Sequence, residues 1–145
     1  MPHQLNIIIG STRPGRAGPV FAHWLERFAG EHGKFKPVLT DIAAFDLPVL
    51  DEPFPPSLRQ PFTKEHSKAW SGAIAPLDAL VFVTPEYNRS IPGVLKNAID
   101  WPSRPFGESV WTDKPGAIAG ATGGVSGTAA AQVHLRSILP VVGVA

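Results

Sequence analysis

The hydrophobic residues of this sequence fall into two alternating patterns. Short, nearly continuous apolar runs are separated by segments in which apolar residues recur every three or four positions. The first pattern is typical of strands buried on both faces of a parallel sheet, and the second is typical of amphipathic helices. The predicted strands are residues 5–9, 36–41, 79–84 and 116–121, with the start of a fifth at 141–145. The predicted helices are residues 19–30, 63–75, 92–101 and 128–139.

This order of elements predicts an α/β fold with a doubly wound parallel sheet. Strands that alternate with helices at this spacing are joined by right-handed crossovers, which place helices on both faces of the sheet. The prolines between Pro48 and Pro61 exclude regular structure and predict a long loop before the second helix. Residues 1–145 are expected to form a single domain, long enough to bury a core without disulfides or metal ions.

The composition excludes several kinds of partner and chemistry. The net charge is +1 and the two signs are interspersed, so we expect no nucleic-acid or membrane-surface partner. The absence of cysteine excludes thiolate catalysis and cysteine metal sites, and the five histidines show no metal-binding spacing, so no metal site is predicted. The N-terminus has no basic leader and no segment reaches membrane-spanning length, so we expect a cytoplasmic protein.

The loop after the first predicted strand has the composition of a phosphate site. In folds of this kind, ligands bind beyond the carboxyl ends of the strands. Residues 10–18 combine glycines, two hydroxyls and two guanidinium groups with the N-terminus of the following helix, whose free N–H groups also bind phosphate. The predicted ligand-binding residues of this loop are Ser11, Thr12, Arg13, Arg16 and Gly18.

Two familiar nucleotide motifs do not fit this loop. Gly10 and Gly15 have the spacing of a P-loop, but Arg16 and Ala17 replace its lysine and its magnesium-binding hydroxyl. Thr12 stands where the dinucleotide fingerprint needs a glycine to let the backbone approach a pyrophosphate. A single terminal phosphate fits better than either, and the alternative is an ordinary turn with solvent-facing arginines.

The loops after the third and fourth predicted strands complete a candidate site for a flat ring. The segment 84–93 combines two prolines and an aromatic ring with amide and hydroxyl groups, although a packed turn explains it equally well. The glycine-rich segment 122–127 follows the fourth predicted strand at the same edge of the sheet, and its alternative is a flexible turn.

A longer string of residues resembles a known family. The sequence Pro85-Glu-Tyr-Asn is followed by Ser90, Pro92-Gly93 and the run from Leu95 to Trp101. This string is similar to the NADPH-dependent FMN reductase family of flavodoxin-like proteins. Matches in the same order extend the resemblance over nearly the whole chain, at residues 10–13, 47–48, 78–79 and 134–139.

The resemblance implies a flavodoxin-like parallel sheet with the strand order 2-1-3-4-5 and FMN at its carboxyl edge. Ser11, Arg13 and Arg16 would hold the phosphate, and the isoalloxazine would lie against Pro85, Glu86, Tyr87 and Asn88. The segment 122–127 would border its pyrimidine end, where small residues let backbone N–H groups reach the flavin carbonyl oxygens, so that Thr122, Gly123 and Gly124 are also implied as ligand-binding residues. Since the family continues through a fifth strand and a final helix, the chain is expected to be truncated at Ala145.

The resemblance also implies a function. The protein would transfer a hydride from NADPH or NADH through FMN to a flat acceptor such as a quinone, an azo compound or free flavin, with no catalytic side chain because FMN carries the chemistry. A homodimer or homotetramer is implied as well. The alternative is a non-enzymatic flavodoxin-type electron carrier, which strong acidity would favour and the net charge of +1 disfavours.

The aromatic segment from Trp101 to Trp111 is either a subunit contact or a satellite core under a loop.

Overall fold

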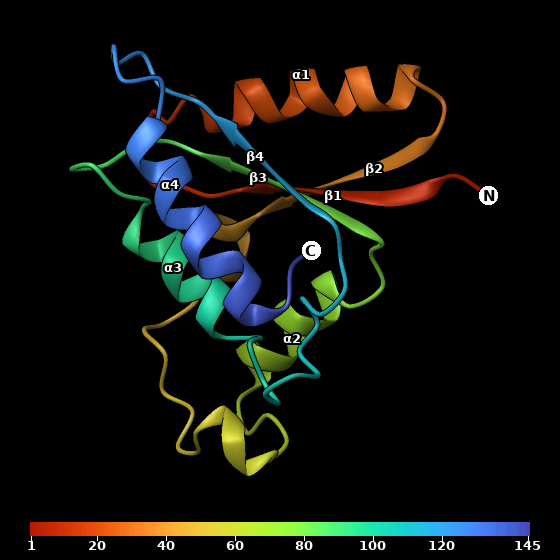
Figure 1. The fold of residues 1–145 in the computed structure, drawn as a ribbon, viewed down its shortest axis with the longest axis vertical. Helices are drawn as coiled ribbons and strands as arrows, with labels where there is room; N and C mark the ends of the chain where they lie inside the picture. The colour runs from red at the N-terminus through yellow and green to blue at the C-terminus, as the bar shows by residue number, and fades with distance from the viewer.

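A four-stranded parallel sheet lies at the centre of the computed structural model, which describes residues 1–145 (Figure 1). The strands are β1 (His3–Ile9), β2 (Phe35–Asp41), β3 (Ala79–Thr84) and β4 (Gly116–Gly120), in the order β2-β1-β3-β4. Ile7 at the centre of β1 pairs with Leu39 of β2 and with Val81 of β3. The four strands and their order confirm the fold class expected from the sequence.

Helices cover both faces of this sheet. They are α1 (Gly18–Glu31), α2 (Glu65–Ile74), α3 (Gly93–Asp100) and α4 (Ala129–Ile138), with short 3-10 helices at η1 (Ile42–Phe45), η2 (Pro56–Leu58) and η3 (Leu139–Val142). Figure 1 shows α1 alone on one face and the other three α-helices on the opposite face. Ile7 and Ile9 of β1 belong to the smaller core cluster with α1, whereas Ile8 belongs to the larger cluster with the other helices. The alternation of side chains along the strand explains why its apolar run is continuous. None of the helices is long and apolar enough to cross a membrane.

The prediction that residues 141–145 begin a fifth strand is wrong. Residues 139–142 form the 3-10 helix η3, and the chain then turns at Gly143 with a φ of 95°. The reason is local, because Pro140 has no N–H for a strand ladder and suits the first turn of a helix. Only Ala145 pairs beside β4: its carbonyl accepts from Gly116 N–H, and its own N–H donates to the Lys114 carbonyl.

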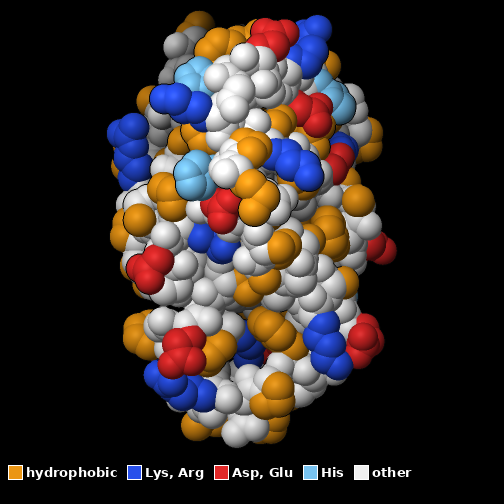
Figure 2. All heavy atoms as spheres, turned by 90° about the vertical axis from the view of Figure 1, so that its right-hand side faces the viewer, with side chains coloured by type: hydrophobic (Ala, Val, Ile, Leu, Met, Phe, Trp, Pro, Cys, Tyr) orange, Lys and Arg blue, Asp and Glu red, His pale blue; other side chains and the backbone are white.

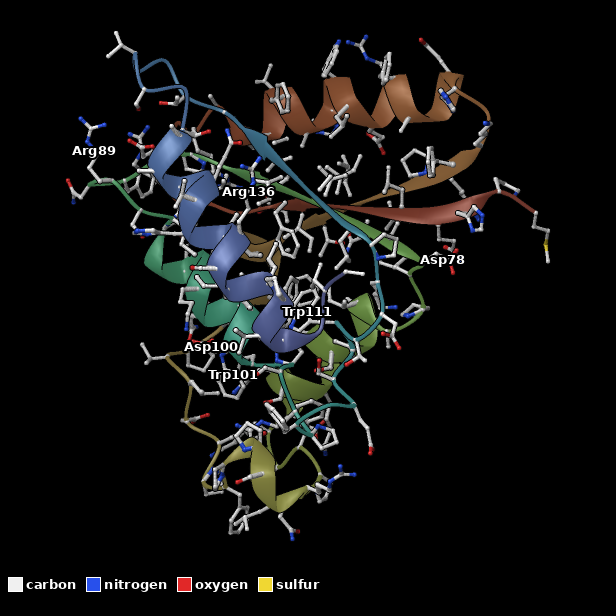
Figure 3. All side chains as sticks on the ribbon, in the orientation of Figure 1. Asp78, Arg89, Asp100, Trp101, Trp111 and Arg136 are labelled. Carbon is white, nitrogen blue, oxygen red and sulfur yellow. The ribbon has the colours of Figure 1, made fainter.

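Two tryptophan side chains donate hydrogen bonds to carbonyl groups at the C-terminal end of α3. The carbonyl of Ala98 would normally accept from the residue four positions later, but that residue is Pro102, which has no N–H. The indole Nε1–H of Trp70 donates to this carbonyl at 2.7 Å, and that of Trp111 donates to the Ile99 carbonyl at 3.0 Å. Trp70, Trp101 and Trp111 are all fully buried in the core, and Figure 3 shows Trp111 in the interior. The sequence left open whether the segment from Trp101 to Trp111 forms a subunit contact or packs into a core. Its two tryptophan rings pack into the core.

Side chains of α3 also hold the loop that follows η1. Asn97 donates from Nδ2 to the Pro48 carbonyl at 2.8 Å and accepts from the Leu50 N–H at 3.0 Å. The indole N–H of Trp101 donates to the same Pro48 carbonyl at 3.0 Å. These bonds give a structural reason for two parts of the sequence resemblance, the pair at 47–48 and the run from 95 to 101. They fix the start of the proline-rich loop against the C-terminal end of α3.

Glu52 anchors the rest of the proline-rich loop to the start of α2. Its carboxylate accepts from the N–H groups of Thr63 and Lys64 and from the hydroxyls of Thr63 and Ser67. Lys64, the residue before α2, provides no side-chain cap of its own. Burial acts to raise the pKa of Glu52, but the hydrogen bonds from Thr63, Ser67 and Lys64 outweigh it and hold the pKa below its usual 4.5. Glu52 therefore acts as a cap from a distant part of the chain.

We expect Glu52→Gln to lower the free energy of unfolding at pH 7 by about 0.5–2 kcal/mol, the usual range for a lost helix cap. Because the folded-state pKa is lowered, the stabilisation by Glu52 is present above pH 4.5 and is lost as the pH falls through the lowered value. Urea unfolding across this pH range should show the difference between wild type and variant shrinking. Glu108→Gln, at an exposed carboxylate outside the helices, is the control. An equal difference at every pH would contradict this role.

Candidate functional site

The three loops singled out in the sequence meet at one cleft. β1, β3 and β4 are adjacent and parallel, so their carboxyl ends lie at the same edge of the sheet, where Thr84 pairs with Gly120. The cleft there has a volume of about 450 Å³, within the range of about 300–1,000 Å³ that is common for ligand sites. Its lining residues are Arg13, Arg16, Ala17, Gly18, Pro85, Glu86, Tyr87, Ala121, Thr122 and Gly123.

Eight of the twelve predicted site residues line this cleft. Of the others, Ser11 is buried within the first loop, and Thr12 lines a neighbouring cleft of about 280 Å³ beside η1. Asn88 is exposed at a turn, and Gly124 lies one residue beyond the lining. Ala17 and Ala121 line the cleft although the sequence interpretation did not select them. An alanine carries no chemical signal, and only its place at the end of a strand or the start of a helix could have pointed to it.

The N-terminus of α1 is open toward the cleft. Ala17 stands at the N-cap position and has no side chain able to cap the helix, and the first turn holds no acidic residue. The N–H groups of this turn thus keep a partial positive charge that favours an anion. At the start of the loop, a Cβ on Gly10 would lie 2.8 Å from Leu95 Cδ2 and 2.9 Å from the Val83 carbonyl oxygen. Glycine there allows the loop to pack tightly between β3 and α3.

Arg16 is held in place by a carboxylate from β2. Its Nη2 lies 2.5 Å from Asp41 Oδ2, and the other oxygen of Asp41 accepts from the Ala43 N–H at the start of η1. The Nε of Arg16 is buried and has no partner. A buried N–H donor without an acceptor is costly, so this guanidinium edge is suited to an additional anionic ligand. The ion pair orients Arg16 without using all of its donors.

The first and second loops are joined by a hydrogen bond between Ser11 and Tyr87. The two side-chain oxygens are 2.7 Å apart, and Ser11 Oγ also accepts from the Arg13 N–H at 3.3 Å. Ser11 is 1% exposed, so its hydroxyl is directed into the base of the loop. This contact places the Tyr87 ring along the wall of the cleft.

A tight turn ends the second loop. Tyr87 and Ser90 form an antiparallel bridge, and Asn88 and Arg89 between them have φ values of 49° and 67°. Positive φ at both central residues is the signature of a type I′ turn, which asparagine tolerates well. Arg89 extends away from the ribbon at the tip of this turn (Figure 3), and its side chain is 79% exposed. Ser90 is in turn tied to α4, through a contact of 2.8 Å with His134 Nδ1.

The carboxylate of Glu86 is directed to the start of α4. Oε2 accepts from the N–H groups of Ala130 and Ala131 at 3.0 and 3.4 Å, and Oε1 accepts from Ser126 Oγ at 3.0 Å. Burial acts to raise the pKa of Glu86, but the bonds from Ser126, Ala131 and Ala130 and the charge of Arg89 outweigh it and lower the pKa below its usual value. Glu86 is therefore ionised at neutral pH.

Small residues shape the third loop. A Cβ on Gly120 would collide with the side chain of Thr128, which is fully buried at the end of this loop with a φ of 64°. Thr122 Oγ1 accepts from the Gly124 N–H at 3.1 Å, which leaves Thr122 and Gly123 facing the cleft.

On the molecular face drawn in Figure 2, basic and acidic side chains are interspersed, in keeping with the small net charge. No three His, Asp or Glu side chains converge where they could hold a metal ion.

Comparison with known proteins gives a consistent result. Residues 4–145 match the family model described as NADPH-dependent FMN reductase. The chain is 44% identical over 140 residues to a 2-hydroxy-1,4-benzoquinone reductase from a Burkholderia species, with 95% of this chain and 70% of that protein aligned. It is 40% identical over 114 residues to an NAD(P)H-dependent FMN reductase from a Nectria species, covering 70% of this chain and 56% of that protein. It therefore spans only part of the length of these relatives.

Solved structures agree with the sequence matches. The flavoenzyme NAD(P)H:(acceptor) oxidoreductase FerB from Paracoccus denitrificans superposes with a TM-score of 0.80 at 34% identity, covering 98% of this chain and 73% of that one. An azoreductase from Bacillus anthracis superposes with a TM-score of 0.68 at 19% identity, over 100% of this chain and 83% of that one. At that identity the second match shows a shared fold alone.

Proposed function

Because the chain belongs to the NADPH-dependent FMN reductase family, we propose that its three-loop cleft holds FMN and that the protein reduces a flat acceptor, such as a quinone, at the expense of NAD(P)H. FMN, when bound, supplies the redox chemistry, accepting hydride from the nicotinamide and passing electrons to the acceptor. The protein supplies binding, orientation and electrostatics. The observation that carries the proposal is the uncapped N-terminus of α1 beside Arg16, at the end of a cleft large enough for a ring.

The first loop has the donors that a terminal phosphate needs. Arg13 and Arg16 line the cleft beside the open N-terminus of α1, Arg16 keeps a buried Nε without a partner, and Ser11 lies buried in the same loop. Thr12 and Gly18 contribute backbone at the same turn. A phosphate at this position would be bound by charge-assisted hydrogen bonds, which are stronger than neutral ones. The residues present therefore fit the phosphate end of FMN.

The second and third loops would hold the ring. Pro85 and Tyr87 give one rigid part of the cleft wall, and Thr122 and Gly123 give another part with little side-chain bulk. Backbone N–H and carbonyl groups on such walls can bond the edge of a flavin while the apolar parts exclude water. Asn88 and Gly124 lie just outside the lining, so we place them at the rim of the ring site.

The four ionisable side chains that line the cleft are Arg13, Arg16, Glu86 and Tyr87. Arg16 is paired with Asp41, Tyr87 with Ser11, and Glu86 with the start of α4. We assign none of these groups the role of a general acid or base, and the acceptor takes its protons from solvent. The same open site serves the nicotinamide and the acceptor in turn.

The competing function is that of a single-electron carrier of the flavodoxin type. Such a carrier would be strongly acidic, whereas this chain has a net charge of +1. Rapid mixing of the FMN-loaded protein with NADPH, and separately with NADH, distinguishes the two functions. We expect the absorbance of bound flavin to be lost on mixing and restored by benzoquinone. A protein that stays oxidised with both nucleotides would contradict the reductase proposal.

Arg16→Ala should weaken FMN binding about 10- to 100-fold, since a hydrogen bond to a charged group contributes about 1.5–3 kcal/mol. Quenching of flavin fluorescence during titration measures this affinity. Arg27→Ala, at an exposed arginine on the outer side of α1, is the matched control and should leave the affinity unchanged. Equal affinities of the Arg16 variant and the wild type would show that this guanidinium serves only the Asp41 ion pair.

We also propose that the protein is cytoplasmic and works as a homodimer or homotetramer. Val94 on α3, Val125 in the third loop and Val133 on α4 are exposed apolar side chains on the elements around the site. Apolar side chains on a surface are a common basis for subunit contacts. Sedimentation equilibrium of the FMN-loaded protein should give a mass of at least two chains. A monomer with full flavin occupancy would contradict the oligomer.

A further inference from the structure

Glu86 joins two parts of the chain that are more than 35 residues apart. Its backbone belongs to the second loop, which lines the cleft, while its carboxylate is bound by Ser126 of the third loop and by the first N–H groups of α4. The side chain is only 8% exposed. Oε1 is bound by the Ser126 hydroxyl and lies 3.7 Å from the Nη1 of the exposed Arg89, and Oε2 is bound by the backbone donors.

α4 lacks the capping groups that helices usually carry. Thr128 stands at its N-cap position with a left-handed backbone, makes no side-chain cap, and the first turn has no acidic residue. Glu86 thus provides, from the neighbouring loop, both the hydrogen-bond acceptor and the negative charge that the start of a helix favours. The start of α1 has no such group, so the two helix N-termini at the cleft differ: one faces a carboxylate of the chain and the other is open.

The third loop depends on this contact for its position. It contains three glycines at 123, 124 and 127, and Val125 at its tip is fully exposed. Glycine gives a loop wide conformational freedom, so the loop needs fixed points. The buried Thr128 provides one at its end, and the bond from Ser126 to Glu86 provides another within it. Without Glu86 the wall formed by Thr122 and Gly123 would lose its side-chain link to the wall formed by Pro85 and Tyr87, and only the bond from the Ala121 N–H to the Thr84 carbonyl would join the two loops at their bases.

We propose that Glu86 is a positioning residue, which fixes the second and third loops at the separation that FMN needs and places a negative charge beside the ring. This inference rests on the proposed function. Reduced flavin at neutral pH carries more negative charge than oxidised flavin, so a nearby carboxylate weakens its binding relative to the oxidised form. Glu86 then lowers the midpoint potential of the bound flavin and makes the reduced protein a stronger reductant.

Two variants separate the position from the charge. Glu86→Gln keeps one acceptor oxygen for the start of α4 and can donate to Ser126 Oγ, but it removes the charge. Glu86→Ala removes both. We expect the alanine variant to bind oxidised FMN about 10- to 100-fold more weakly and the glutamine variant to bind it nearly as well as wild type. The glutamine variant should favour reduced over oxidised flavin about tenfold more than wild type, which is about 30 mV for a two-electron couple. Glu108→Gln, at an exposed carboxylate bound to Arg59, is the control.

Hydrogen exchange of the flavin-free protein tests the positioning without FMN. Amides 130 and 131 should exchange faster in Glu86→Ala than in wild type and remain protected in Glu86→Gln. Faster exchange together with a wild type that binds no FMN would support the positioning and refute the proposed function instead. Unchanged exchange in Glu86→Ala would overturn the positioning role, and an unchanged potential in Glu86→Gln would overturn the role of the charge.

Discussion

Replacing Ala17 with aspartate is expected to weaken FMN binding about 100-fold without destabilising the fold. Ala17 stands at the uncapped N-terminus of α1 and lines the cleft where we place the phosphate. A carboxylate there would occupy the favourable field of the helix and repel a bound phosphate. Two like charges 4 Å apart repel by about 4 kcal/mol at an effective dielectric constant of 20, and a 100-fold loss corresponds to about 2.8 kcal/mol.

The opposite signs of the two effects make this test specific. The same aspartate should raise the free energy of unfolding by up to about 1 kcal/mol, because an acidic residue at a helix N-terminus is stabilising. Ala17→Asn has a similar size and no charge, so its FMN affinity should stay much closer to that of wild type. Fluorescence titration with FMN and urea unfolding of the flavin-free protein measure the two quantities. If aspartate and asparagine had equal effects on FMN binding, the phosphate would not lie at this helix.

Trp70→Ala is expected to cost about 3–5 kcal/mol of folding stability, the largest loss that we predict for a single substitution. Trp70 is fully buried, and its Phe45 contact has a centroid distance of 4.8 Å. Its indole N–H also satisfies the Ala98 carbonyl, whose usual helical partner is replaced by Pro102. The substitution therefore opens a cavity and leaves a buried acceptor without a donor. In a domain of this size we expect the melting temperature to fall by about 6–20 °C.

Two further tryptophan variants separate the contributions at this site. Trp70→Phe keeps most of the ring volume but removes the N–H, so it should cost about 1–3 kcal/mol for the unsatisfied carbonyl together with a smaller packing loss. Trp24→Phe, on the exposed side of α1, should stay within about 0.5 kcal/mol of wild type. Thermal unfolding followed by circular dichroism measures all three. A Trp70→Ala variant as stable as Trp24→Phe would contradict the capping of α3.

The sheet, and the place of the cleft where we propose the site, could be predicted from the sequence because both depend on local patterns. Apolar runs such as the one ending at Ile9 mark strands that are buried on both faces, and the α/β order then determines where their carboxyl ends meet. Arg13 and Arg16 could be selected because a cationic, glycine-containing turn before a helix has few other uses. The structure brings both to the cleft with residues 85–87 and 122–123, as expected.

What the sequence could not give are contacts between distant segments. Nothing around Glu86 indicates that its carboxylate caps a helix that begins at Ala129, and nothing around Glu52 indicates its bonds to Thr63. The start of a fifth strand is predicted from the apolar run at 141–145, but Pro140 and the left-handed Gly143 favour a 3-10 turn. The two carboxylate contacts leave no local signal in the sequence, and in the third case a local backbone preference outweighs the hydrophobic pattern.

The comparison of FMN with riboflavin tests the central claim most directly, since the two differ only in the phosphate. Equilibrium titration of the flavin-free protein, followed by flavin fluorescence, gives both dissociation constants under the same conditions. With two arginines and an open helix N-terminus around the phosphate, we expect FMN to bind at least about 100-fold more tightly than riboflavin, and this difference to shrink in Arg16→Ala. Equal affinities for FMN and riboflavin would contradict the assignment of residues 11–16 as the phosphate site.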